Sequence, residues 1–303
     1  MKNTFRFVNE ESAEEHQPLP VTRAIPSLIK WTGSKRSQAP EIVRLMPSYK
    51  RYIEPFIGGG AMLYAAAIPG SIASDIYRPL IDLWLLIQKS PNLVIDDYRK
   101  QWQAVNDELD VLDKNNLPSN TALPLYYYQV RERFNREKNP LDLNFLMRTC
   151  VNGIVRFNDK GEFNNSFHLS RRGMEPARFE KAVTAWQNII KGVEFLCQDY
   201  SATLSRAVAG DFIYLDPPYA GNKQRYAADL DIERFFSELD KLNSRGVKWA
   251  LSFDGSRGDQ SFLHDVPKSI YKRHTLLSSG ASAVNKVLNG PVMAVEESLY
   301  LNY

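Results

Sequence analysis

The chain contains few of the residues that bind metal ions or form disulfide bonds. Its 303 residues include two cysteines, Cys150 and Cys197, and four histidines that are scattered without the spacing of metal ligands. Two cysteines are too few for a disulfide framework or for a structural zinc site. The sequence therefore predicts a protein without structural disulfides and without a bound metal.

Long apolar runs are also absent from the sequence. No stretch approaches the ~18 consecutive apolar residues that indicate a membrane-spanning helix. The first residues lack the apolar centre of a signal peptide. We therefore expect a cytoplasmic protein with no membrane partner, and we expect it to be a monomer.

Charge of one sign does not dominate the sequence. The net charge is only +3, so a nucleic-acid partner would have to be bound by locally concentrated basic residues. Basic residues are concentrated in two stretches, 131–138 and 171–172. The first stretch also contains two glutamates, so a solvated helix face explains it equally well.

The sequence does contain an alternation of helical and strand-like segments, which predicts a doubly wound α/β sheet. Between residues 92 and 192, helical stretches precede a segment that loses the helical period, so we expect an inserted helical lobe with a basic hairpin. The tip of this hairpin is predicted at residues 159–161, which read Asp-Lys-Gly. Residues 1–25 are polar and rich in glutamate and are expected to form a flexible extension.

The tetrapeptide Asp216-Pro217-Pro218-Tyr219 follows a predicted buried strand, residues 211–215. The two prolines stop the strand because they donate no backbone hydrogen bond. A carboxylate at the carboxyl end of a strand lies where open α/β sheets bind ligands. The carboxylate and a proline carbonyl could accept hydrogen bonds from the exocyclic amine of a base and stabilise its developing positive charge. The tyrosine ring could stack on that base.

A second motif is a glycine-rich turn between a short apolar strand and an alanine-rich helix. Residues 54–60 read EPFIGGG, and Asp75 ends the next predicted strand. Glycines at such a turn allow the backbone to approach a ligand, and an acid at the next strand end commonly binds ribose hydroxyls. The spacing is not the GxGxxG of dinucleotide-binding proteins, which argues against a nicotinamide-dependent oxidoreductase.

Together these segments resemble the Dam-type DNA adenine-N6 methyltransferases, the D12 class with the α-group order of motifs. The matching stretches are KWTGSK (30–35), EPFIGGG (54–60), ASDI (73–76), RFNDKGEFN (156–164) and DPPY (216–219). DPPY alone occurs by chance, but the ordered set is specific, and the resemblance covers residues 28–303. It implies S-adenosylmethionine as cofactor, S-adenosylhomocysteine as product, double-stranded DNA as partner, and base flipping. It also implies a catalytic domain of residues 26–91 and 193–303, and a target-recognition lobe of residues 92–192.

The resemblance assigns a role to each cofactor-binding residue. Trp31 and Lys35 would contact the methionine end of the donor or close over it. Gly58 and Gly60 would form the turn beneath the donor, and Asp75 would bind its ribose hydroxyls.

Two further acids follow strands and would complete the site. Asp216 would lie between donor and acceptor. Asp199 could reach the adenine of the donor, but it also precedes a predicted helix and could simply begin that helix.

The DNA-reading residues are expected on two segments. Arg156 matches the arginine that reads guanine in the family, Lys30 matches a basic position that touches the first base of the site, and Asn152 lies near Arg156 in the chain. Phosphate contacts are the alternative for the two basic residues. GATC is the expected site, although two positions depart from the family pattern. Val151 replaces an aromatic wedge, and Ser166 replaces a proline.

The same motifs are compatible with other functions. The scaffold could serve a DNA-binding protein without turnover, or an enzyme that methylates cytosine N4, RNA or a protein glutamine. Asp rather than Asn at position 216, together with the order of the motifs, favours adenine in DNA. The sequence does not say whether a restriction enzyme accompanies the protein.

Overall fold

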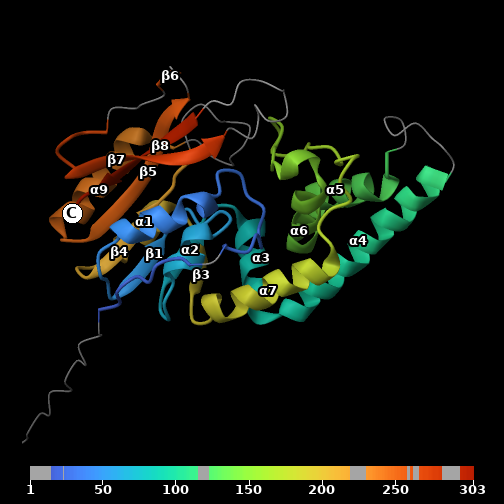
Figure 1. The fold of residues 1–303 in the computed structure, drawn as a ribbon, viewed down its shortest axis with the longest axis horizontal. Helices are drawn as coiled ribbons and strands as arrows, with labels where there is room; N and C mark the ends of the chain where they lie inside the picture. The colour runs from blue at the N-terminus through green and yellow to red at the C-terminus, as the bar shows by residue number, and fades with distance from the viewer. Residues whose placement is uncertain are drawn as a thin grey trace, which may run out of the picture.

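The computed structural model describes residues 15–22, 24–114, 123–218, 230–257, 260–261, 266–281 and 294–303. Within these residues an eight-stranded sheet has the order β3-β2-β1-β4-β5-β8-β7, with β6 beside β5 (Figure 1). The strands are β1 (Arg51–Glu54), β2 (Ile72–Asp75), β3 (Glu194–Cys197), β4 (Asp211–Leu215), β5 (Lys248–Arg257), β6 (Gln260–Ser261), β7 (Arg273–Ala281) and β8 (Ala294–Leu301).

The five strands from β3 at one edge to β5 are parallel, and β8 runs antiparallel to both of its neighbours. Side chains alternate between the two faces of the sheet, so Tyr52 and Phe212 belong to one apolar cluster, and Ile53 and Ile213 to the other. Parallel strands that are buried on both faces carry near-continuous apolar sequence. This explains why residues 211–215 could be predicted as a strand.

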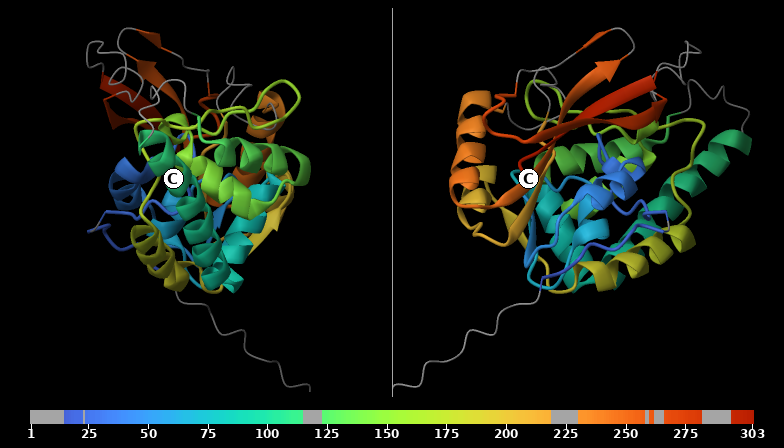
Figure 2. Two further views of the ribbon diagram at one scale, coloured as in Figure 1. Left: turned by 90° about the vertical axis from the view of Figure 1, so that its right-hand side faces the viewer. Right: turned by 60° about the vertical axis from the view of Figure 1, so that its left-hand side comes forward.

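Helices cover both faces of the sheet, which confirms the doubly wound α/β prediction. The apolar residues of α1 to α3 join one cluster and those of α8 and α9 the other, and Figure 2 shows the two layers. The helices are η1 (Lys35–Ser37), α1 (Ala39–Leu45), α2 (Ala61–Ala66), α3 (Arg78–Lys89), α4 (Pro91–Lys114), α5 (Leu125–Glu137), α6 (Pro140–Thr149), η2 (Val151–Gly153), α7 (Pro176–Ile190), α8 (Tyr200–Ser205) and α9 (Ile232–Ser244).

The order of the strands fixes where a ligand can bind. The chain moves outward from β1 to β2 and β3, and then returns to place β4 on the other side of β1. Loops therefore diverge at the carboxyl ends of β1 and β4, which is the crevice where open α/β sheets bind their ligands. Glu54 ends β1 and Asp216 follows β4 directly.

Helices α4 to α7 project from one side of the sheet (Figure 1). They share a continuous core with the sheet domain, because Trp186 of α7 lies 5.1 Å from Trp84 of α3 and 4.9 Å from Tyr64 of α2, measured between ring centroids. The lobe of residues 92–192 is thus joined to the sheet domain by buried aromatic contacts. Its role as a target-recognition unit stays a prediction.

The N-terminal segment is attached to the sheet domain in its described part. His16 and Tyr49 exchange two backbone hydrogen bonds of 2.7 and 3.0 Å, Pro18 is buried, and Ile25 belongs to the core. These contacts place His16, Pro18 and Ile25 against the sheet domain, and the flexibility of residues 1–25 stays a prediction. The remainder of residues 1–25 lies outside the described ranges.

Among the helices of the described residues, none combines the length and the apolar character needed to cross a membrane.

Candidate active site

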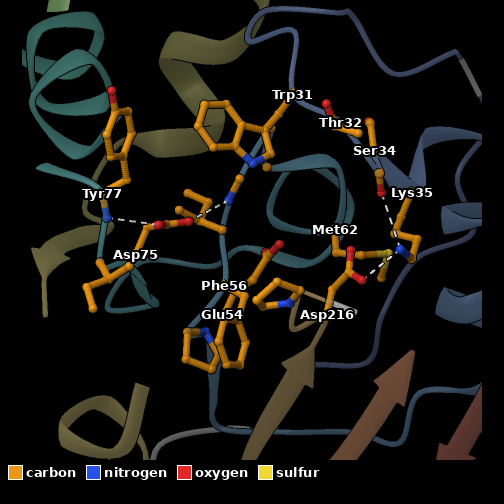
Figure 3. A pocket seen from close by; sticks show the side chains of 18 of the residues that line it. Trp31, Thr32, Ser34, Lys35, Glu54, Phe56, Met62, Asp75, Tyr77 and Asp216 are labelled. Atoms are coloured by element: carbon orange, nitrogen blue, oxygen red, sulfur yellow. Dashed lines mark hydrogen bonds and ion pairs between the residues drawn. The ribbon is translucent and has the colours of Figure 1, made fainter. Parts of the chain in front are cut away.

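A pocket opens at the carboxyl ends of β1, β2 and β4, where the strand order places the crevice. Its lining includes the glycine turn, the ends of these strands and η1, and concave sites of this kind are where small ligands usually bind. Figure 3 shows Asp75 and Tyr77 on one side of the pocket, Lys35 and Asp216 on the other, and Trp31 between them. The lining of the pocket includes residues from all five of the sequence motifs.

The glycine turn forms the wall beneath Trp31. Gly58 and Gly60 have φ values of +44° and +67°, a region that side chains rarely adopt. A Cβ on Gly58 would lie 2.8 Å from the Trp31 ring, and a Cβ on Gly60 would lie 2.8 Å from the Trp84 ring. These glycines are therefore required both by the turn and by close packing of two tryptophans.

Asp75 links the end of β2 to the glycine turn. Its carboxylate accepts hydrogen bonds from the backbone N–H of Gly58 at 3.3 Å and of Tyr77 at 3.0 Å. Burial raises the pKa of Asp75 to about 6, although these two hydrogen bonds oppose the shift. Asp75 holds the turn in place and also faces the pocket, and its predicted ribose contact stays a prediction.

Asp216 forms an ion pair that joins distant parts of the chain. The Lys35 ammonium, in η1, lies 2.7 Å from Asp216 Oδ1 and 2.9 Å from Glu297 Oε1 on β8. It also donates to the carbonyl of Gly33 at 3.2 Å. Burial raises the pKa of Asp216 to about 6; the Lys35 ammonium opposes this shift and the Glu297 carboxylate adds to it. Burial opposes the charge of Lys35, but its two carboxylate partners outweigh burial and raise its pKa.

The rest of the predicted catalytic tetrapeptide is described in part. Pro217 is buried and Pro218 lines the pocket. Tyr219 lies outside the described residues, so its stacking on a base stays a prediction.

Glu54 also lines the pocket, although no role was predicted for it from its sequence position. It is 3% exposed and accepts a hydrogen bond of 2.8 Å from the hydroxyl of Tyr52. Burial raises the pKa of Glu54 well above its usual value. Its position at a strand end before a proline was a usable signal, the same one that singled out Asp216.

Asp199 begins α8, as one of the two readings of the sequence expected. Its carboxylate accepts from the Ser201 backbone N–H at 3.0 Å and from Arg234 at 2.8 Å. It also lines the pocket beside two aromatic rings, Phe56 and Tyr200, whose centroids are 5.4 Å apart. A contact between Asp199 and a donor adenine stays a prediction.

Several pocket residues carry buried polar atoms without a hydrogen-bond partner within the described structure. They are the hydroxyls of Thr32, Tyr77 and Tyr200. Buried polar groups are normally paired, and an orphan requires an explanation. Because all three side chains line the pocket, a polar ligand there would supply partners. In the ranges that the structure describes, no group of three or more His, Cys, Asp or Glu side chains is placed to hold a metal ion.

The predicted DNA-reading residues lie near each other at the edge of the lobe. The side chain of Lys30 lies against Gly153 of η2, where a Cβ would lie within 2.3 Å of its amine, and burial lowers the pKa of Lys30. Asn152, also in η2, has a φ of +56°. Arg156 is exposed, and its Nε donates to Asn164 Oδ1 at 3.0 Å. The structure therefore brings Lys30 to the segment that bears Asn152, while contacts of these residues with DNA stay predictions.

The two departures from the family pattern are neighbours in space. The backbone N–H of Val151 donates to the carbonyl of Ser166 at 2.8 Å, and Val151 is 37% exposed.

The predicted hairpin tip is a tight turn, in which the Gly161 N–H donates to the Asn158 carbonyl at 2.9 Å. Phe157, next to Arg156, lines the pocket, and its ring centroid lies 5.4 Å from that of Tyr77, so this segment connects the lobe to the pocket.

The strand order and the pocket at its switch point define a Rossmann-like α/β fold of the methyltransferase type. The family model described as D12 class N6 adenine-specific DNA methyltransferase matches residues 31–282. The chain therefore belongs to the D12 class N6 adenine-specific DNA methyltransferases, as the resemblance of its motifs implied.

Similar proteins come from an archaeon, a bacterium and a phage. The type II methyltransferase M.MjaIII of Methanocaldococcus jannaschii is 30% identical over 258 residues, 75% of this chain and 84% of that protein. A DNA adenine methylase of Vibrio cholerae is 24% identical over 275 residues, 86% of this chain and 93% of that protein. A DNA N-6-adenine-methyltransferase of Escherichia phage P1 is 28% identical over 261 residues, 83% of this chain but only 33% of the phage protein.

Proposed function

We propose that this protein transfers a methyl group from S-adenosylmethionine to N6 of an adenine that is flipped out of duplex DNA. The observation that carries the proposal is the position of Asp216. Its largely buried carboxylate follows β4 at the switch point and faces a pocket that also contains the glycine turn and Asp75. Membership of the adenine-specific family supports the choice of base.

The pocket residues fit the cofactor that the family implies. Asp75 would accept hydrogen bonds from the ribose hydroxyls, and the Phe56–Tyr200 pair offers ring surface for the adenine. Trp31 and Lys35 border the opposite end, where the methionine part would lie. The unpaired hydroxyls of the pocket would find partners on such a ligand. When bound, S-adenosylmethionine supplies an electrophilic methyl group.

Asp216 would activate the target amine by hydrogen bonding. The lone pair of an exocyclic amine is delocalised into the base, so an acceptor that draws on its N–H makes the nitrogen more nucleophilic. A carboxylate also stabilises the positive charge that develops on nitrogen during transfer. Asp216 accepts in its ionised form, which the Lys35 ammonium in contact with it favours. The carbonyl of Pro217 would be the second acceptor.

The lobe would hold the duplex and read its sequence. Arg156 is exposed for a bidentate contact with guanine, and Lys30 and Asn152 would contact neighbouring bases. We propose GATC as the site, a cytoplasmic location and action as a monomer. The small side chains at positions 151 and 166 mark where the readout can differ from that of relatives.

The test is transfer of a tritiated methyl group from S-adenosylmethionine to unmethylated duplex DNA by the purified protein. The DNA is then digested and its nucleosides are separated. The proposal predicts label in N6-methyladenine alone, and none with Asp216→Ala. Label in N4-methylcytosine would overturn the choice of base. DNA binding without any label would indicate a protein that keeps the scaffold without turnover.

A further inference from the structure

One ammonium is shared by two buried carboxylates beside the pocket. Lys35 lies 2.7 Å from Asp216 and 2.9 Å from Glu297, and its side chain is 5% exposed, against 21% for Asp216 and 12% for Glu297. The three residues come from η1, from the end of β4 and from β8. The proposed function uses Asp216 and places Lys35 at the cofactor, but it gives Glu297 no role.

The path of β8 explains why an acid lies at this buried position. Side chains alternate along a strand, so Glu297 shares a face with Leu299 and Leu301, which belong to the core. The register between β5 and β8 shifts between Ser252 and Gly255, and Gly255 pairs with Glu297. Such a bulge redirects side chains near active sites. Glu297 therefore continues the buried face of β8 to the carboxyl edge of β5, where it reaches Lys35.

We propose that Glu297 is a positioning residue for methyl transfer. It anchors the Lys35 ammonium beside Asp216 and keeps this ammonium from neutralising the Asp216 carboxylate. The inference rests on the proposed function of Asp216, because it concerns how that carboxylate stays available to the target amine.

The two carboxylates compete for one ammonium. Because Glu297 also attracts Lys35, Asp216 keeps acceptor strength even with Lys35 in contact. Without Glu297 the ammonium would hold Asp216 more strongly, because screening by water is weaker at a largely buried site than in bulk solvent. The target amine would then compete with a full counter-ion for the same oxygens. Glu297 also gives Lys35 a second partner when Asp216 turns towards the amine.

The groups that face Asp216 from the surrounding described elements are few. Lys35 approaches from η1, Glu54 from β1, Tyr214 from β4 and Glu297 from β8. The Tyr214 hydroxyl bonds the Ser252 hydroxyl at 2.7 Å, and burial raises the pKa of this tyrosine well above its usual value, so it is neutral. Burial raises the pKa of Asp216 and the Glu297 carboxylate raises it further. Removing the Glu297 charge should therefore lower the pKa of Asp216.

The test compares Glu297→Gln with Glu296→Gln, a matched control at the neighbouring, exposed position of the same strand. Carboxyl-carbon NMR of protein labelled with ¹³C-aspartate, without cofactor or DNA, follows the titration of Asp216, whose signal is assigned from its absence in Asp216→Asn. We expect Asp216 to titrate about one pH unit lower in Glu297→Gln and unchanged in Glu296→Gln.

The second measurement is the single-turnover rate at pH 8 with saturating cofactor and DNA. We expect Glu297→Gln to slow transfer about 10-fold, the effect of one charge-assisted hydrogen bond, while cofactor affinity stays within about twofold. Glu297→Asp keeps the charge but holds it farther from Lys35, so it should shift the titration of Asp216 and the rate in the same direction as Glu297→Gln, by a smaller amount. If Glu297→Gln does not fold, Glu297→Asp becomes the test, because its shorter side chain holds the carboxylate farther from Lys35. Both the pKa of Asp216 and the single-turnover rate should then fall.

An unchanged titration of Asp216, or an unchanged rate, in folded Glu297→Gln would overturn the proposal. Failure of the proposed function looks different: the wild-type protein itself would then transfer no methyl group to adenine.

Discussion

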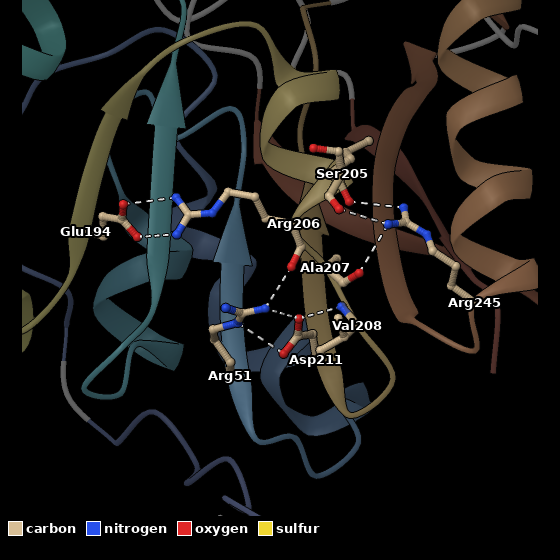
Figure 4. A network of polar contacts seen from close by, with 9 residues as sticks. Arg51, Glu194, Ser205, Arg206, Ala207, Val208, Asp211 and Arg245 are labelled. Atoms are coloured by element: carbon tan, nitrogen blue, oxygen red, sulfur yellow. Dashed lines mark hydrogen bonds and ion pairs between the residues drawn. The ribbon is translucent and has the colours of Figure 1, made fainter.

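The carboxyl ends and the amino ends of the parallel strands, here called the carboxyl edge and the amino edge of the sheet, use charged side chains in opposite ways. At the carboxyl edge, Asp75 and Asp216 have a pKa raised to about 6 by burial, and Asp216 shares a single ammonium with a second acid. At the amino edge, each acid is paired closely with an arginine (Figure 4). The acids at the carboxyl edge therefore face a ligand pocket, whereas those at the amino edge are already paired within the protein.

The amino edge is a network of geometrically matched ion pairs. Arg51, the first residue of β1, donates to both oxygens of Asp211, the first residue of β4, at 3.1 and 2.6 Å. Arg206 donates to both oxygens of Glu194, the first residue of β3, at 2.9 and 2.6 Å. Such bidentate pairs satisfy the carboxylate fully, and the hydrogen bonds from Arg206 lower the pKa of Glu194. We infer that this edge serves stability, while the carboxyl edge gives up stability for chemistry.

The largest expected effect is on the carboxyl edge. Asp216→Ala should reduce methyl transfer by at least ~100-fold, because it removes the group that polarises the amine. Folding should survive, since the change removes a poorly compensated buried charge. The rate is measured under single-turnover conditions, with circular dichroism to confirm the fold. A variant that keeps more than about a tenth of the wild-type rate would show that the site is wrongly assigned.

The converse change is Arg51→Ala on the amino edge. It leaves Asp211, which is 4% exposed, without its counter-ion. We expect a loss of about 3 kcal/mol in the free energy of unfolding, the low end of the range for breaking a buried pair, because Arg51 is itself 28% exposed. Urea denaturation measures this loss. The methyl-transfer rate per folded molecule should stay near that of the wild type, and a specific loss of rate would remove the contrast between the edges.

A smaller effect is expected from Asp75→Ala. It should weaken S-adenosylmethionine binding by about 1–3 kcal/mol, the value of a charged hydrogen-bond partner. Calorimetry gives the cofactor affinity, and DNA affinity without cofactor serves as the control. Because Asp75 also holds the backbone N–H of Gly58, Asp75→Asn is the matched variant that keeps an acceptor for the turn. Equal losses of cofactor and DNA affinity would indicate misfolding rather than a lost ribose contact.

The pH dependence should have opposite signs at the two edges. The folded protein holds the Asp216 proton more tightly than the unfolded chain, whose carboxyl titrates near its usual 3.8. Stability from this group therefore falls as pH rises from about 4 to about 6. The lowered pKa of Glu194 gives stability that is present above its usual 4.5 and is lost as pH falls. The measurement is thermal unfolding at a series of pH values. Asp216→Asn should remove the fall in stability between pH 4 and 6, and Glu194→Gln should remove the loss of stability at low pH. If both variants changed the pH dependence in the same direction, the comparison would be contradicted.

Local patterns allowed the strands and turns of the site to be predicted, because their determinants lie within a few residues. The apolar run before Asp216, the glycines after Glu54 and the helix start at Asp199 each depend on adjacent sequence. The pairing of Lys35 with Asp216 spans 181 residues, and no sequence period reports such a contact. Glu297 looked like any acid on a strand until the register of β8 placed it inside.

The same limit applies at the N-terminus. Residues 15–22 have the polar composition of a flexible segment, yet His16 pairs with the backbone of Tyr49. Likewise, the sequence predicts a tight turn at Gly60 but not the rings of Trp84 and Trp186, which approach it closely enough to exclude a side chain. In both cases the partner comes from a distant segment and is invisible in the local pattern.

Methylation-aware sequencing of unmethylated plasmid DNA treated with the purified protein and S-adenosylmethionine tests the central claim most directly. The account predicts N6-methyladenine in one fixed sequence context, with GATC expected, and no methylated base after treatment with Asp216→Ala. Methylated cytosine, or an Asp216→Ala pattern equal to that of the wild type, would contradict it.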